Sequence, residues 1–105
     1  MAAGEIPSKK AFEDDRVLAF YDLDPQAPIH ILLIPKEHIA SAAEITEENG
    51  TIVAHIFAVA AKLAKDLNLD KGWRVVTNVG ADGGQTVMHM HFHLLGGRSM
   101  AWPPG

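Results

Sequence analysis

The chain has 105 residues, 48% of them hydrophobic, which suits one domain with a buried core and is too short for two ordinary domains. Thirteen acidic against nine basic residues give a net charge of -4, and no run of lysine and arginine occurs, which disfavours a nucleic-acid-binding protein. The absence of cysteine excludes disulfides and cysteine-ligated metal sites within the chain. No signal-peptide pattern or apolar run of ~20 residues is present, so we expect a cytoplasmic protein that binds no membrane.

Two short apolar runs near the N-terminus predict β-strands. Residues 17–21 form the first, and the Asp-Leu-Asp-Pro that follows at 22–25 indicates a turn. Residues 29–34 form the second, which proline bounds on both sides and which is too short for a helix. His30 lies at the start of this second predicted strand.

A helical periodicity follows. Apolar residues recur at steps of three or four between residues 46 and 67, which predicts the long helix of the domain. We expect Thr46 to be its N-cap, with the two following glutamates complementing the helix dipole. His55 falls on the polar stripe of this helix, where we expect it to be solvated, and Phe57 is expected in the core.

The last third of the chain predicts an antiparallel hairpin. Residues 73–79 alternate like a half-buried strand, and we expect its first residue, Trp73, in the core. The turn-rich residues 80–84 then lead into a strand from about residue 86 to 95, which Asn78 would face. Strands, one long helix and a hairpin together predict an α+β fold with an antiparallel sheet.

Three histidines alternate with apolar residues in the predicted last strand: His89, His91 and His93. On a strand, the three imidazoles would project from one face and the intervening apolar side chains from the other, toward a core. Histidine titrates near neutral pH, so the pattern indicates a nucleophile, an acid–base group, a metal site or a pH switch.

The spacing disfavours a metal held by all three histidines. Neighbouring members would lie about 6.7 Å apart along a strand and the outer pair about 13 Å apart. A zinc ion with bonds of about 2.0–2.1 Å cannot gather all three. Two of them with a third ligand such as His38 or His30 remain an alternative, although His38 is more simply a loop residue.

A nucleophilic imidazole is the other interpretation. Attack through one ring nitrogen requires an acceptor that holds the proton of the other, and His91 has a histidine on each side. At a phosphorus centre, the developing charge would be met by protonated histidine and backbone N–H donors. The Gly-Gly-Gln-Thr loop at 83–86 would supply such donors; alone, it would be an ordinary hairpin turn, as Asp22 would be an ordinary turn aspartate.

The sequence resembles the histidine triad (HIT) superfamily. The pattern His-x-His-x-His-x-x at residues 89–95 is similar to its signature, and residues 19–28, 30–39 and 96–105 resemble its Hint (histidine triad nucleotide-binding) branch. The resemblance implies a five-stranded antiparallel sheet with one long and one short helix, in a single domain spanning residues 1–105. It also implies a two-fold homodimer with a continuous sheet, in which residues 96–105 contribute to the dimer and the active site.

The resemblance bears on metals as well. Members often carry a Cys-x-x-Cys pair before a Gly-Glu-Ile-Pro segment, and this pair builds a zinc site with two histidines. Here the segment stands at residues 4–7 without the pair, so the chain looks shortened. We expect no structural zinc, no other metal and no cofactor.

The resemblance further implies a hydrolase that cleaves the P–N bond of purine nucleoside 5'-phosphoramidates, AMP or GMP joined to an amine. His91 would be the nucleophile that forms a nucleotidyl-histidine, His93 would assist the leaving group, and His89 and His30 would support orientation and charge. The nucleotide-binding residues would be Asp22 at the ribose, Leu23 and Phe20 at the base, and Asn78, Gly84, Gln85 and Thr86 at the phosphate. Trp102 would reach the partner's site, although Ala101 before it replaces a frequent histidine.

Two other functions stay open. The protein would be a nucleotide-binding interaction protein without catalysis if the triad were only a recognition surface. It would be a dinucleoside polyphosphate hydrolase or nucleotidyltransferase if it followed the sister branches of the superfamily, which the C-terminal residues 96–105 argue against.

Overall fold

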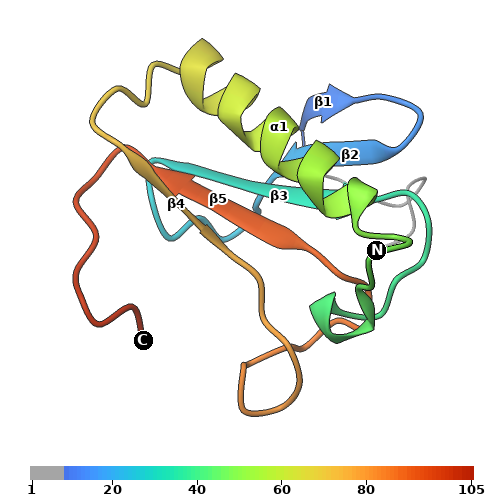
Figure 1. The fold of residues 1–105 in the computed structure, drawn as a ribbon. Helices are drawn as coiled ribbons and strands as arrows, with labels where there is room; N and C mark the ends of the chain where they lie inside the picture. The colour runs from blue at the N-terminus through green and yellow to red at the C-terminus, as the bar shows by residue number, and fades with distance from the viewer. Residues whose placement is uncertain (1–8) are drawn as a thin grey trace.

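The computed structural model describes residues 9–105, so the Gly-Glu-Ile-Pro segment at 4–7 lies outside the described part (Figure 1). Its elements in chain order are β1 (Lys10–Glu13), β2 (Val17–Tyr21), β3 (Ile29–Pro35), a 3₁₀ turn (Ala42–Glu44), α1 (Thr51–Asp66), β4 (Trp73–Val76) and β5 (Phe92–Gly96). The α+β class is confirmed, and the expected short helix is the single 3₁₀ turn. No helix in this part of the chain is long and apolar enough to span a bilayer.

The five strands form one antiparallel sheet in the order β1-β2-β3-β5-β4. β5 lies between β3 and β4, so the predicted C-terminal hairpin is inserted beside β3. In the β3–β5 pair Leu32 lies opposite His93, and His30 lies opposite Leu95. Because opposite residues of an antiparallel pair point to the same face, His30 and His93 share one face of the sheet.

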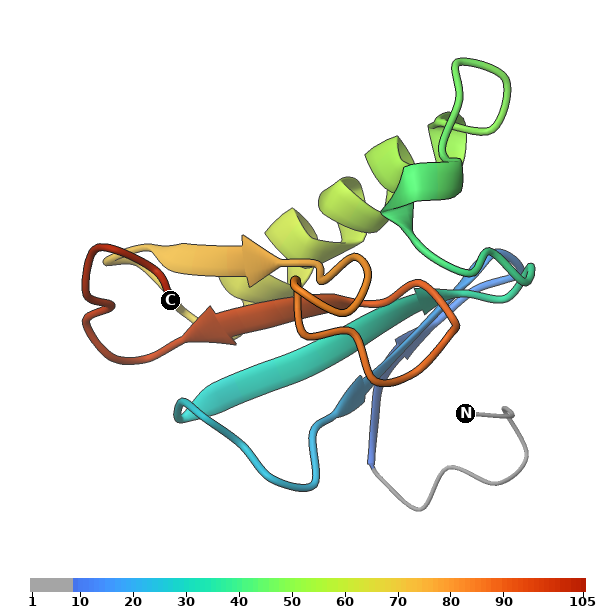
Figure 2. The same ribbon diagram turned by 90° about the horizontal axis from the view of Figure 1, so that it is seen from below.

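Helix α1 lies across the other face (Figures 1 and 2). Its buried residues recur with the predicted periodicity, and they pack on side chains of β2, β3 and β5 that include Ile31, Leu33 and Leu94. On the histidine face, Leu18, Phe20 and Ile34 form a smaller buried cluster. The sheet therefore has a core side and a second side that combines a short apolar row with imidazoles.

The helix begins later than predicted. Its first residue is Thr51, its N-cap is Gly50, and no side chain caps it. Thr46 instead exchanges hydrogen bonds with Asn49, whose side-chain oxygen accepts from the Thr46 N–H at 2.6 Å while the Thr46 hydroxyl accepts from the Asn49 N–H at 3.4 Å. Local side-chain bonds of this kind compete with helix formation, so the expectation of a Thr46 N-cap was wrong.

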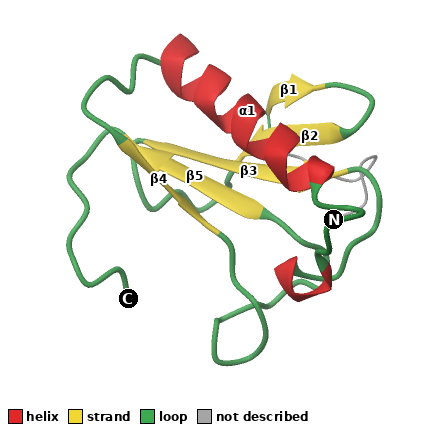
Figure 3. Cartoon of the chain, viewed as in Figure 1, coloured by secondary structure: helices red, strands yellow, loops and turns green. Residues whose placement is uncertain are grey.

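Both hairpin strands are shorter than predicted. β4 ends at Val76, β5 begins at Phe92, and residues 77–91 form a loop, green in Figure 3. Only His93 of the three histidines therefore lies on a strand, and the expectation that all three alternate along one strand was wrong. Met90, next to His91, donates its backbone N–H to the carbonyl of Ile39 rather than to β4.

Three further expectations fail at the surface. Phe57 is 44% exposed and Trp73 is 40% exposed, so neither is a core residue. Phe57 lies on the flank of α1 with its ring edge against Phe92, and Trp73 starts the edge strand β4. His55 is bonded rather than freely solvated, because its Nε2 lies 2.6 Å from Asp14 Oδ2 in the turn between β1 and β2. His38 lies in an exposed loop, as expected.

Candidate active site

The candidate site is centred on two imidazoles of neighbouring strands. His30 Nε2 lies 2.9 Å from His93 Nδ1, and the two ring centroids are 5.1 Å apart. Asp22, in the loop after β2, places its Oδ2 3.5 Å from His30 Nε2. The β3–β5 pairing thus brings His93 to Asp22 and His30, from which it is separated by more than sixty positions in the sequence.

The proton positions on this pair follow from a backbone donor. The Gln26 N–H donates to His30 Nδ1 at 3.0 Å, so Nδ1 is an acceptor and the proton of a neutral His30 is on Nε2. That Nε2–H then donates to His93 Nδ1. His93 in turn carries its own proton on Nε2, where it is available to a bound molecule.

Burial keeps both rings neutral near pH 7. It lowers the pKa of His30, against the opposing effect of the Asp22 and Asp24 carboxylates. It also lowers the pKa of His93 to about 4, and the neighbouring His91 and His30 add to this while Asp22 opposes it. The pair is therefore a chain of hydrogen bonds between neutral imidazoles, whose tautomers decide what it can donate.

His91 has the opposite arrangement. Its Nδ1 lies 2.8 Å from the carbonyl oxygen of His89, and because a carbonyl can only accept, Nδ1 carries the proton. The lone pair of a neutral His91 is then on Nε2. The ring lies 5.1 Å from that of His93 by centroids, in an edge-on arrangement. An oriented imidazole with a free Nε2 therefore stands beside an imidazole with a free Nε2–H.

His89 acts here through its backbone. Its imidazole Nε2 is 2.9 Å from the carbonyl oxygen of Pro35 at the end of β3, and its ring contacts that of His38 edge-on. The His89 side chain therefore holds the loop against β3, and the His89 backbone carbonyl orients His91. His30, predicted for the same supporting role, bonds His93 instead.

Gln85 closes the loop between β4 and β5. Its side-chain oxygen accepts from the Gly80 N–H, and its amide nitrogen donates to the carbonyls of Ala40 and Val87 at 2.7 and 2.9 Å. Both amide protons of this buried side chain are thus engaged within the protein. Gly84, the preceding residue, has φ +82° and open space where a Cβ would be.

Two groups that contribute to the site were not predicted from the sequence. The Thr77 hydroxyl donates to the carbonyl of His91 at 2.9 Å, and the Gln26 backbone sets the His30 tautomer. Thr77 could have been found from its place at the end of an alternating strand opposite the histidines. The Gln26 N–H has no signal in the sequence, because any residue except proline supplies one.

The other predicted binding residues differ in how far they are exposed. Leu23 is 72% exposed next to Asp22, whereas Phe20 is buried in the apolar row. Thr86 is exposed and Asn78 is half-buried beyond the end of β4. Trp102 is 82% exposed on the C-terminal tail, where it lines a cavity of about 490 Å³ together with Asn78 and other residues of β4 and the tail. The tail is held there by Arg74, which donates to the Ala101 carbonyl at 3.1 Å.

Within residues 9–105, one group of side chains has the spacing of a metal site. Ligand atoms of Asp22, His30 and His93 lie within 4.8 Å of one another. The tautomer argues against this use, since His30 Nε2 carries the proton while Gln26 donates to Nδ1. Ligation through Nε2 would set two N–H donors against each other at Nδ1, so these residues fit a metal poorly.

The fold is an α+β fold with a five-stranded antiparallel sheet, and the candidate site combines a strand histidine with an oriented histidine of the adjoining loop. Among α+β proteins the chain belongs to the HIT family, since the HIT domain model matches residues 3–100. A HIT-like protein of Synechococcus elongatus is 52% identical over 96% of this chain and 89% of its own length. A 14 kDa zinc-binding protein of Zea mays is 50% identical over 96% of this chain and 80% of its own length.

Solved structures agree with this assignment. A HIT family hydrolase from Legionella pneumophila superposes with a TM-score of 0.95 at 50% identity, covering 100% of this chain and 95% of that one. A histidine triad protein from Clostridium difficile gives a TM-score of 0.90 at 51% identity, covering 95% of this chain and 88% of that one. The fold is therefore that of the HIT family hydrolases.

Proposed function

We propose that this HIT-family protein belongs to the Hint branch and hydrolyses the P–N bond of purine nucleoside 5'-phosphoramidates. The observation that carries the proposal is the bond from His91 Nδ1 to the His89 carbonyl, which leaves the Nε2 lone pair free for attack. The ring of His93 lies 5.1 Å from that of His91 by centroids, and its Nε2–H would donate to a phosphoryl oxygen or a leaving nitrogen.

In the proposed reaction, His91 Nε2 attacks phosphorus, a bond from His91 to phosphorus forms, and the bond from phosphorus to the amine breaks. The departing amine takes up a proton, which reaches it from solvent through His93. Water then attacks the nucleotidyl-histidine, releases AMP or GMP with a proton, and restores His91. His91 keeps its Nδ1–H on the His89 carbonyl throughout, so the positive charge on the substituted ring is stabilised.

The remaining predicted residues would bind the nucleotide. Asp22 would accept from the ribose hydroxyls, and exposed Leu23 would cover a base that lies over the row containing Phe20. Asn78 and the Thr86 hydroxyl would bind the phosphate, and the open space at Gly84 would allow its close approach. Gln85 would contribute by holding the shape of the loop, because its amide protons are already engaged.

We further propose that residues 1–105 act as one HIT domain in a two-fold homodimer whose sheet continues through β4. β4 is an edge strand that begins at half-exposed Trp73, and half-exposed Phe57 of α1 contacts Phe92 on the neighbouring strand β5. Unpaired strand edges and apolar side chains favour association with a second copy. The tail with Trp102 would then reach the partner's site. Sedimentation equilibrium tests this, with a monomer at micromolar concentration as the contradicting result.

The decisive experiment is single-turnover hydrolysis of a fluorogenic adenosine 5'-phosphoramidate by wild type and His91→Ala, with mass spectrometry of the quenched protein. We expect turnover and an adenylate adduct in the wild type alone, with AMP binding retained in the variant. Equal activity in both proteins contradicts the proposal. AMP binding without turnover would indicate a binding protein, and faster cleavage of diadenosine polyphosphate would indicate the sister-branch activity.

A further inference from the structure

We propose that Arg98 is a positioning residue that holds Gln26 in place and thereby keeps the proton of His93 on Nε2. The inference deepens the proposed function, because it assigns the control of the donor that would face the leaving group. It rests on a series of hydrogen bonds that joins a surface cavity to the histidine pair.

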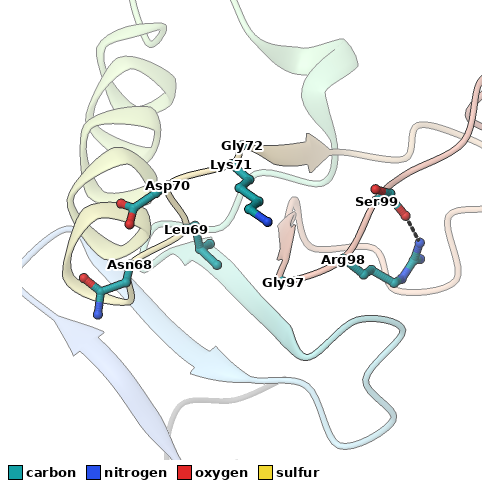
Figure 4. A pocket seen from close by; sticks show the side chains of 8 residues that line it. All are labelled: Asn68, Leu69, Asp70, Lys71, Gly72, Gly97, Arg98 and Ser99. Atoms are coloured by element: carbon teal, nitrogen blue, oxygen red, sulfur yellow. Dashed lines mark hydrogen bonds between the residues drawn. The ribbon is translucent and has the colours of Figure 1, made fainter.

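The series begins in the segment after β5. Arg98 Nε donates to the Gln26 carbonyl at 3.0 Å, and Nη1 donates to the Ser99 carbonyl at 2.9 Å. Arg98 lines a cavity of about 420 Å³ between this segment and the loop after α1, to which Lys71 also contributes (Figure 4). The bond to Ser99, dashed in Figure 4, fixes the plane of the guanidinium, so that Nε is directed at Gln26.

Close packing holds the same two segments together. A Cβ at Gly97 would lie 2.9 Å from Pro28 Cβ, and Gly97 has φ +91°, which glycine adopts without strain. Arg98 thus stands at a junction where the loop between β2 and β3 meets the end of β5. The Gln26 side chain bonds within its own loop, to the Asp24 carbonyl, so the Arg98 bond is what ties the Gln26 backbone across the junction to the segment after β5.

Gln26 transmits this position to the imidazoles. Its carbonyl accepts from Arg98, while its N–H donates to His30 Nδ1. If the loop moves and the N–H is withdrawn, neutral His30 is free to carry its proton on Nδ1. His30 Nε2 would then be an acceptor facing His93 Nδ1, and the bond would re-form only with the His93 proton moved to Nδ1. The Nε2 donor of His93 would be lost without any change of charge.

The test compares Arg98→Met with Lys71→Met, which removes the other cation of the same cavity. Proton–nitrogen correlation spectra of the histidine side chains at neutral pH report which ring nitrogen carries the proton, with no substrate present. We expect Arg98→Met to shift His93 toward the Nδ1–H form. We expect kcat to fall about 10-fold, part of the 10²–10⁴-fold that a positioned proton donor contributes, with KM within about 2-fold. Lys71→Met should leave both unchanged.

Arg98→Lys provides a second measurement, since one ammonium donor is able to reach the Gln26 carbonyl without the fork to Ser99. We expect an intermediate tautomer population and an intermediate kcat. An unchanged His93 tautomer in Arg98→Met, or in Arg98→Lys if the methionine variant does not fold, overturns the inference. So does an equal change in Lys71→Met. Because the spectra need no turnover, a wild type without phosphoramidase activity would refute the proposed function while the role of Arg98 is still decided.

Discussion

His30 Nε2 and His93 Nδ1 form a 2.9 Å hydrogen bond across two paired strands, between rings that burial keeps neutral. The bond has a direction, because Gln26 donates to the far nitrogen of His30. His93 is therefore a hydrogen-bond donor through Nε2, although its pKa lies well below that of an ordinary histidine. Burial keeps both rings neutral, and the Gln26 N–H decides which tautomer the neutral pair adopts.

The first prediction concerns how the free energy of unfolding depends on pH. The pKa of His93 is about 4 in the folded protein against 6.5 for an ordinary histidine, so the unfolded chain binds more protons between these values. The free energy of unfolding should be highest above pH 6.5 and fall as the pH decreases toward 4, by up to about 3 kcal/mol from this group. Urea unfolding of the wild type and His93→Asn at a series of pH values measures it. His38→Asn, at an exposed histidine, is the control, and equal pH dependence in wild type and His93→Asn would refute the prediction.

The second prediction separates a structural from a substrate-binding Gln85. Gln85→Glu would set an oxygen against the carbonyls of Ala40 and Val87 in a buried place. We expect a loss of about 2–3 kcal/mol in the free energy of unfolding, since two buried acceptors lose their donor. The control Glu47→Gln, an acid–amide exchange at an exposed side chain, should cost less than about 0.5 kcal/mol. Unchanged stability with a raised KM would show instead that Gln85 binds the phosphate directly.

The third prediction concerns Thr77, one residue beyond the end of β4. The pairing of β4 with β5 ends at Val76 and His93. Beyond it, the Thr77 hydroxyl donates to the carbonyl of His91 and fixes its position. Thr77→Val should lower kcat about 3- to 10-fold by letting the nucleophile move, at a cost of about 1 kcal/mol in stability. Thr77→Ser should restore the rate. Thr51→Val removes a hydroxyl at the start of α1 and serves as the control, and a valine variant with full kcat would exclude the positioning role.

Much of the fold follows from local patterns. The apolar run at 17–21, the proline-bounded strand and the period of α1 are visible in the sequence because each depends on which face of an element is buried. The start of α1 was missed because Thr46 and Asn49 bond each other, a choice between two local hydrogen-bonding patterns of similar energy.

The site was predictable by residue type and only partly by geometry. Alternating histidines indicated a shared face, but His89 and His91 lie in a loop that Gln85 and Met90 tie to the segment at Ile39 and Ala40. Those tethers join residues about fifty positions apart, and their bonds outcompete continued pairing with β4. No periodicity in the sequence records such a contact.

The fold class, the long helix and the residue types of the candidate site follow from the sequence alone, because these depend on side-chain type and on apolar spacing along the chain. Only the tertiary structure decided which nitrogen of each imidazole holds the proton. That choice is made by the Gln26 N–H at His30 and by the His89 carbonyl at His91. Every residue type has the carbonyl and every type except proline has the N–H, so neither group can be recognised from the sequence. What distinguishes them is their position after folding, when the strands and loops place a donor beside one ring and an acceptor beside the other.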